Sequence, residues 1–75
     1  MRIEQIVAEV LETDPHEIGD DTGYAVHERW TSLAHLEIMT VTEETYGISL
    51  TSTEMRSTTS VGALRTLLKS KGVEA

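Results

Sequence analysis

The residues best suited to chemistry stand at the start of a helix-forming run, in the stretch RWTSLAHL (29–36). Ser32 or Thr31 can cap this helix, because a side-chain oxygen at the cap accepts a hydrogen bond from an otherwise unpaired N–H group. The same corner suits a second role. Free N–H groups and the positive end of the helix dipole stabilise a phosphate, so an exposed serine there can carry a phosphate-linked group. The spacing alone leaves both interpretations open.

No other group of residues in the chain is typical of a reactive site. The chain has no cysteine, which excludes disulfides, thiolate metal sites and a cysteine nucleophile. His16, His27 and His35 lack the spacing of metal ligands. His35 follows Ser32 by one turn, where packing at a seam between helix and loop is favoured over contact with a bound group. We therefore predict neither a catalytic site nor a metal site.

Composition predicts a small acidic protein. The 75 residues suit one domain, and thirteen acidic side chains against six basic ones give a formal net charge of −7. Such a surface repels nucleic acid and suits partners with basic docking surfaces, although acidity can serve solubility alone. The apolar runs are too short to cross a bilayer, and residues 1–4 do not resemble a signal peptide. We expect a cytoplasmic monomer that binds neither nucleic acid nor membrane.

The periodicity of apolar residues predicts the helices that must position Ser32. The first helix carries an apolar stripe of Ile3, Ile6, Val7, Val10 and Leu11. It ends before Pro15, because the residue that precedes a proline avoids the α region. Asp14 is expected to cap one short turn that contains Pro15 and Glu17, with Ile18 packed inwards.

A loop of about 13 residues, 19–31, separates this turn from the next helix. A loop this long in a small domain is usually functional or held by packing. Tyr24, Val26 and Trp30 are expected to anchor it in the core rather than to contact a ligand.

The second helix is expected over residues 32–46, with Gly47 as its left-handed stop. One broad face carries the residues expected to pack inwards: Leu36, Ile38, Met39, Thr42 and Tyr46. A second face carries Leu33, Glu37, Thr40, Val41 and Glu44.

Two further helices follow a short extended link at residues 48–50. Thr51 and Glu54 form a capping box for a short helix through Arg56. The last helix has apolar residues at helical spacing, namely Val61, Leu64, Leu67 and Leu68, and ends before Gly72. The chain is thus predicted to be an all-α, small four-helix bundle in one domain, 1–75. It has three main helices, one short helix and a long loop between the first two.

This order of elements resembles an acyl or peptidyl carrier protein over nearly the whole chain. The resemblance rests on "DPHEIGDDT", "TSLAHLEIMTVTEETYGISL" and "TSVGALRTLL". In that family the serine before leucine is esterified with 4′-phosphopantetheine from coenzyme A, which implies Ser32 here. The family's acidic recognition positions correspond to Glu37, Glu43 and Glu44. The "WxSLxHL" form is more similar to free-standing carriers of polyketide or nonribosomal peptide pathways than to fatty-acid carriers.

The resemblance implies a carrier of acyl or aminoacyl thioesters with no catalytic residues of its own. Its partners would be a phosphopantetheinyl transferase, a loading enzyme, and downstream synthase or tailoring enzymes. They would dock on the second helix through Leu33, Glu37, Thr40, Val41, Glu43 and Glu44. Thr31 stands where the family usually has aspartate. A carrier-like adaptor that is never modified is therefore one alternative, and an unrelated acidic helical interaction module is another.

Overall fold

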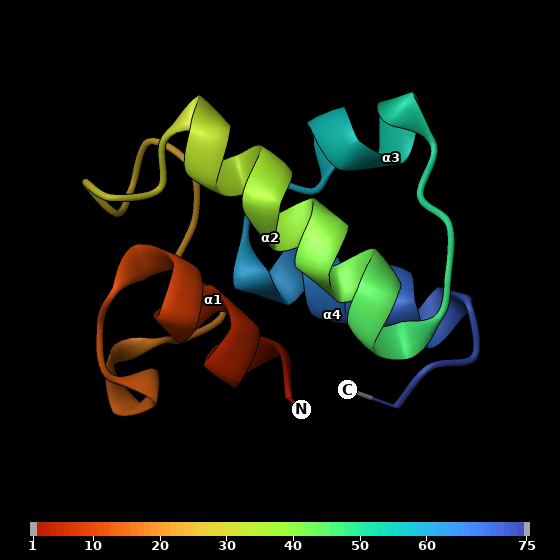
Figure 1. Cartoon of the computed structure of the whole chain (residues 1–75), viewed down its shortest axis with the longest axis horizontal. Helices are drawn as coiled ribbons and strands as arrows, with labels where there is room; N and C mark the ends of the chain where they lie inside the picture. Colours follow the sequence, from red (N-terminus) through yellow and green to blue (C-terminus); the bar gives the residue numbers. More distant parts are fainter. Residues whose placement is uncertain (1, 75) are drawn as a thin grey trace.

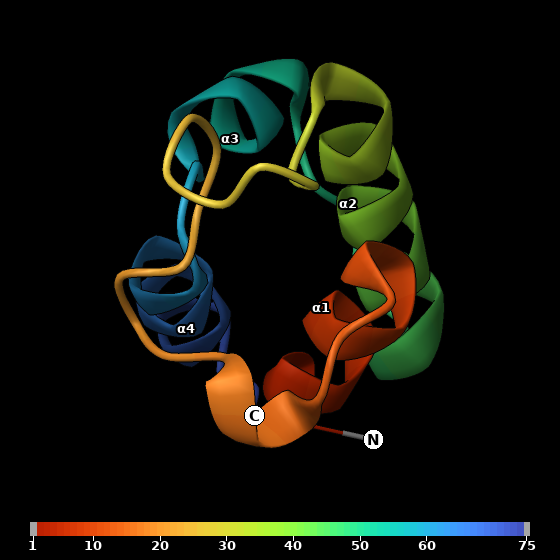
Figure 2. The same cartoon turned by 90° about the vertical axis from the view of Figure 1, so that its left-hand side faces the viewer.

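The computed structural model describes residues 2–74 as four α-helices and one 3-10 turn around a shared core. In chain order these are α1 (Ile3–Leu11), η1 (Pro15–Glu17), α2 (Ser32–Tyr46), α3 (Ser52–Ser57) and α4 (Val61–Ser70). The helix α1 packs against both α2 and α4 (Figure 1). Figure 2 shows α2 and α4 on opposite sides of the core, with α3 beside the first turns of α2. The all-α bundle with one short helix is confirmed.

Capping side chains and a left-handed glycine set where the helices begin and end. Asp14 caps η1 by accepting a hydrogen bond from the His16 N–H (2.8 Å). Gly47 closes α2 with a φ of 63°, the left-handed conformation that glycine adopts without strain. Thr51 and Glu54 form the predicted capping box of α3. None of the helices within residues 2–74 combines the length and the apolarity that crossing a bilayer requires.

The core gathers apolar side chains from α1, α2 and α4, together with Trp30 from the loop and Ile18 from the end of η1. Its most buried members are Ile3, Ile6, Val7, Leu11, Trp30, Ile38, Met39, Val61, Leu64 and Leu68. The predicted stripes of α1 and α4 are confirmed, and so is the inward packing of Ile18.

Three predicted core residues lie at the surface instead. Tyr24 is 46% exposed, Val26 73% and Leu36 56%. The inner arc of α2 runs through Ala34, Ile38 and Thr42 at four-residue spacing, and Leu36 falls outside this arc. Trp30 alone fills the space between the loop and the core, so Tyr24 and Val26 are left outside it.

The loop of residues 19–31 is fixed along the junction between α3 and α4. Gly23 pairs with Ser60 in an antiparallel bridge. Three backbone hydrogen bonds extend this seam: Tyr24 N–H to the Thr59 carbonyl (2.9 Å), Val61 N–H to the Thr22 carbonyl (2.9 Å) and Gly62 N–H to the Asp20 carbonyl (3.0 Å). Carbonyl groups of the loop therefore accept hydrogen bonds from N–H groups in the first turn of α4. The same bonds hold the loop backbone in place.

Gly23 has no room for a side chain, because a Cβ atom there would lie 2.3 Å from the Thr59 carbonyl oxygen. We expect Gly23→Ala to lower the free energy of unfolding by roughly 1–3 kcal/mol, measured by urea denaturation. Gly19 is the matched control, since a Cβ atom there meets nothing within 4 Å. Gly19→Ala should change stability by less than ~0.5 kcal/mol. Equal effects of the two substitutions would contradict a tightly closed seam.

Candidate cofactor-attachment site

The N-terminus of α2 is capped by Thr31 and not by Ser32. The Thr31 hydroxyl accepts a hydrogen bond from the Ala34 N–H (3.2 Å), and its backbone has the extended conformation of an N-cap. Ser32 is the first helical residue, and it is exposed. Its hydroxyl is therefore not committed to the cap and faces solvent at the electropositive end of a 15-residue helix.

The Ser32 hydroxyl lies where the loop, α2 and α3 meet. Its oxygen is 3.4 Å from the Tyr24 hydroxyl oxygen. In the described part of the chain, Ser32 lines a hollow of about 580 Å³ on the loop side and one of about 360 Å³ between α2 and α3. A third, of about 210 Å³, is shared with Tyr24 and Arg56. A large modifying enzyme therefore has open access to this oxygen.

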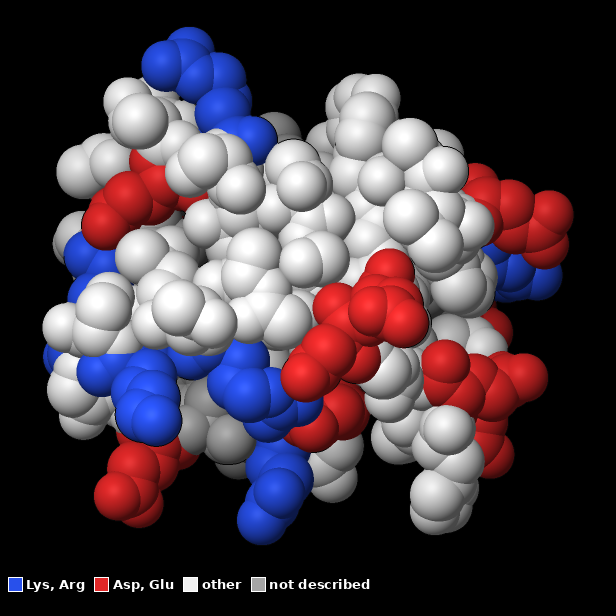
Figure 3. Space-filling view, turned by 180° about the vertical axis from the view of Figure 1, so that it is seen from behind, with Lys and Arg blue, Asp and Glu red and all other residues white. Residues whose placement is uncertain are grey.

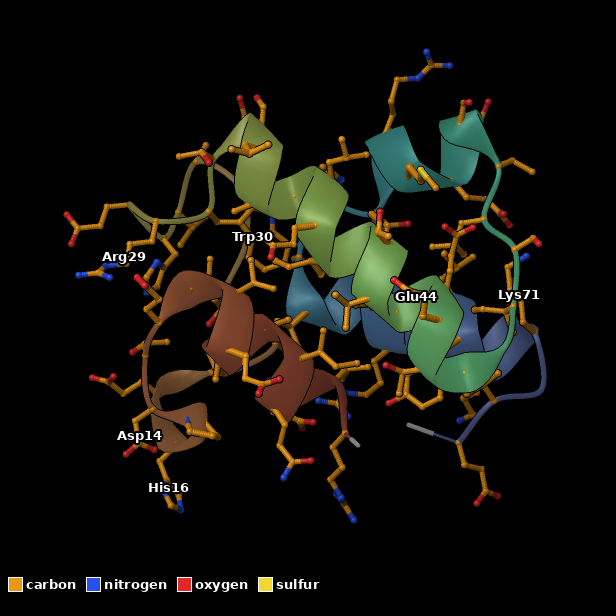
Figure 4. The ribbon with its side chains drawn as sticks, viewed as in Figure 1. Asp14, His16, Arg29, Trp30, Glu44 and Lys71 are labelled. Atoms are coloured by element: carbon orange, nitrogen blue, oxygen red, sulfur yellow. The ribbon has the colours of Figure 1, made fainter. Side chains whose placement is uncertain are left out.

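A partly buried hydrogen-bond chain fixes the first turns of α2 against the loop and α3. The Trp30 indole N–H donates to Nδ1 of His35 (3.0 Å), and Nε2 of His35 contacts the Met55 carbonyl oxygen (2.6 Å). An indole N–H only donates and a carbonyl only accepts, so the imidazole accepts at Nδ1 and donates from Nε2. The predicted packing of His35 at a seam is confirmed. Figure 4 shows Trp30 between the loop and α2.

Most of the residues predicted for docking share the outer face of α2, opposite the core. Leu33 is 76% exposed there, and Glu37, Thr40 and Glu44 are exposed as well. Val41, at the edge of this face, is half-buried. Glu44 points away from the bundle (Figure 4). We call this set, Leu33, Glu37, Thr40, Val41 and Glu44, the outer face of α2.

The structure places Glu43 apart from this face. Its carboxylate accepts a hydrogen bond from the Leu50 N–H (2.8 Å), and its side chain is half-buried. It therefore holds the link of residues 48–50 against the end of α2. Spacing along α2 could not reveal this role, because the partner N–H lies beyond the end of the helix.

Positive charge is segregated from α2. The helix α2 holds glutamates and neither lysine nor arginine, whereas residues 61–73 hold Arg65, Lys69 and Lys71 and no acid. Figure 3 shows several lysine and arginine side chains on the back of the molecule, where α4 lies, with acidic side chains among them. There Arg65 hydrogen-bonds Glu4 (2.7 Å), which holds the pKa of Glu4 below its ordinary value. The outer face of α2 thus offers only negative charge to a partner.

A comparison with known protein families agrees with this arrangement around Ser32. A family described as "Phosphopantetheine attachment site" matches residues 2–68, most of the chain and all of the elements around Ser32 up to the last turn of α4. The chain belongs to this family of carrier proteins. The resemblance found in the sequence is confirmed. The carrier is not an enzyme, and its cofactor is covalently attached 4′-phosphopantetheine.

A curated relative supports the same assignment. The carrier is 36% identical over 70 residues to "Polyketide-8 synthase acyl carrier protein 2" of Streptomyces avermitilis, a match that covers 93% of this chain and 80% of the relative. The residues around Ser32 fit the cofactor, because they present an exposed hydroxyl beside open hollows at a helix N-terminus. Among residues 2–74, no cluster of histidine, aspartate and glutamate could hold a metal ion.

Sequence reasoning missed Tyr24 and Arg56 as neighbours of Ser32. The sequence predicts Tyr24 in the core and gives Arg56 no role beyond the end of a short helix. The contact between Tyr24 and Ser32 depends on the seam between the loop and Thr59, which no local pattern encodes.

Proposed function

We propose that Ser32 carries the 4′-phosphopantetheine arm. The observation that carries this proposal is the position of its hydroxyl, exposed at the N-terminus of α2 and relieved of capping by Thr31. In the attachment step, Ser32 Oγ attacks the phosphorus atom of coenzyme A next to the pantetheine. The phosphate–phosphate bond breaks, adenosine bisphosphate leaves, and the serine proton passes to a base of the transferase.

The arm supplies a thiol, which holds the transported group as a thioester and which a chain without cysteine lacks. Ser32 fixes the point at which the arm joins the protein, which we call the root of the arm. The hydrogen-bond chain through His35 keeps that point in place relative to α3. Tethering raises the local concentration of the intermediate near a docked enzyme. The carrier therefore needs no catalytic side chain.

Polyketide biosynthesis is the pathway that the named relative favours, with an acyl group as the cargo. The partners would be a phosphopantetheinyl transferase, a loading enzyme, and downstream synthase or tailoring enzymes in the cytoplasm. Transport of aminoacyl groups in nonribosomal peptide synthesis is the second candidate, because the "WxSLxHL" stretch is similar to carriers of both pathways. In either case residues 1–75 act as one carrier domain.

The decisive experiment is incubation of the carrier with coenzyme A and a broad-specificity phosphopantetheinyl transferase. Intact-mass analysis should show addition of one phosphopantetheine, and fragmentation should place it on Ser32. The protein purified from its native host should carry the same group. If several transferases add nothing and the native protein is unmodified, the proposal fails. Retained partner binding would then support an unmodified adaptor.

The outer face of α2 is proposed as the docking surface for these enzymes. Glu37 and Glu44 would meet arginine or lysine on the partner, while Leu33 gives an apolar contact next to Ser32. Charges of this exposed kind steer the encounter and contribute little affinity each at physiological salt. Weak binding suits a carrier that visits several enzymes in turn.

Reversing charge on this face should slow each partner enzyme without unfolding the carrier. We expect Glu37→Lys and Glu44→Lys together to lower the rate of loading at limiting carrier concentration by about tenfold or more, mainly through association. Glu9→Lys together with Glu74→Lys is the matched control, because it reverses two exposed glutamates outside α2 and changes the net charge by the same amount. An equal loss of rate in this control would show that the net charge of the carrier matters and that the outer face of α2 does not.

A further inference from the structure

The contact between Tyr24 and Ser32 is loose in the free hydroxyl form. At 3.4 Å, the separation of the two oxygens exceeds the usual range of about 2.5–3.0 Å for an O–H···O hydrogen bond. Esterification removes the serine proton and adds phosphate oxygens beyond Oγ, on the side where free space lies. The Tyr24 phenol can then donate to an anionic acceptor, and hydrogen bonds of this kind are shorter and stronger than those between neutral groups.

The fold holds Tyr24 beside Ser32, although its ring is about half exposed. The Tyr24 N–H is bonded to the Thr59 carbonyl (2.9 Å), and the preceding Gly23 is tightly enclosed. The next residue, Ala25, has a φ of 67°, a conformation that costs energy for any residue with a side chain. The loop therefore turns sharply just after Tyr24, and the seam fixes where its ring begins.

Arg56, an exposed residue of α3, borders the same space. It lines the hollow shared with Tyr24 and Ser32, and also the larger hollow between α2 and α3. Within residues 2–74 no carboxylate lies at ion-pair distance from it, whereas Arg29 pairs with Glu12. A guanidinium without a carboxylate partner, on a side chain that borders this space, is suited to bind a phosphodiester on Ser32, because its planar donors match phosphate oxygens.

We propose that Tyr24 and Arg56 bind the phosphodiester that joins the arm to Ser32, and so hold the root of the arm between the loop and α3. This inference rests on the proposed attachment at Ser32. It makes Tyr24 and Arg56 positioning residues of the loaded form. Binding of the anion joins the loop to α3 across the attachment point, so the loaded carrier is more stable than the unloaded one.

The test compares loaded and unloaded forms of the wild type, Tyr24→Phe, Arg56→Gln and the control Arg29→Gln. Intact mass is checked first, and only fully loaded protein is melted. We expect loading to raise the melting temperature of the wild type and of Arg29→Gln by on the order of 4 °C. In Tyr24→Phe and in Arg56→Gln less than half of this rise should remain. Their phosphorus NMR signals should also differ from those of the wild type and the control.

The outcomes separate this inference from the attachment itself. If the wild type gains no mass, the proposed attachment fails. If all variants load but show the same rise in melting temperature and the same phosphorus shift, attachment stands and the role of Tyr24 and Arg56 is overturned. Unloaded variants that melt with the wild type exclude a general loss of folding as the cause.

Discussion

We expect Ser32→Ala to abolish the addition of phosphopantetheine, while Ser52→Ala leaves it intact. The two serines form a matched pair. Each is exposed and is the first residue of a helix, and each follows a threonine that caps that helix. If exposure and helix position sufficed, both would be modified. Only Ser32 lies beside Tyr24 and at the start of the acidic helix that we propose as the docking surface.

The stability of Ser32→Ala should be nearly unchanged, which makes the loss of loading interpretable. Because Thr31 supplies the cap, removing the Ser32 hydroxyl should cost less than ~0.5 kcal/mol of unfolding free energy. Circular dichroism during a urea titration measures this cost. A loaded Ser32→Ala protein, or a Ser52→Ala protein that fails to load, would contradict the assignment of the site.

Trp30→Ala should have the largest effect on stability, a loss of about 3–5 kcal/mol. Trp30 is only 2% exposed, belongs to the core cluster, and donates to His35. Its truncation leaves a cavity and removes the partner of a half-buried imidazole nitrogen. In a domain this small, such a loss approaches the whole free energy of unfolding. The far-UV circular dichroism of Trp30→Ala at 25 °C should show a large unfolded population.

Two further variants separate the causes of that loss. Trp30→Phe keeps most of the apolar ring but removes the N–H donor, so it should cost about 1–3 kcal/mol. Val26→Ala, in the same loop, should cost less than ~0.5 kcal/mol because Val26 lies outside the core. A Val26→Ala variant as unstable as Trp30→Ala would contradict the division of the loop into one anchor and two surface residues.

The helix boundaries could be predicted because they depend on neighbours in sequence. The capping box of α3, the cap of η1 and the glycine at the end of α2 are all local. The surroundings of Ser32 could not be predicted in the same way. The sequence predicts Tyr24 and Leu36 in the core, and both lie at the surface. The spacing of apolar residues does not show which side of a helix or loop packs against the rest of the chain.

The positions of Tyr24, Glu43 and the cap of α2 depend on the folded chain and not on local sequence. Trp30 is buried and occupies the core below the loop, whereas Tyr24 lies at the surface beside Ser32. Glu43 is a similar case, since its partner N–H, that of Leu50, comes into reach only after the chain turns at Gly47. The sequence also leaves open whether Thr31 or Ser32 caps α2, because both side chains are suited to it. The three-dimensional structure assigns the cap to Thr31.

The separation of negative α2 from positive α4 has a consequence for how the carrier approaches an enzyme. Because α2 carries acids and no base, whereas the side of α4 carries charges of both signs, the electric field of a basic enzyme would exert a turning moment on the molecule before contact. Rotation in that field would turn α2, and with it Ser32, toward the enzyme. For the docking surface and attachment site that we propose, the productive orientation would thus be selected during diffusion, and added salt would randomise it.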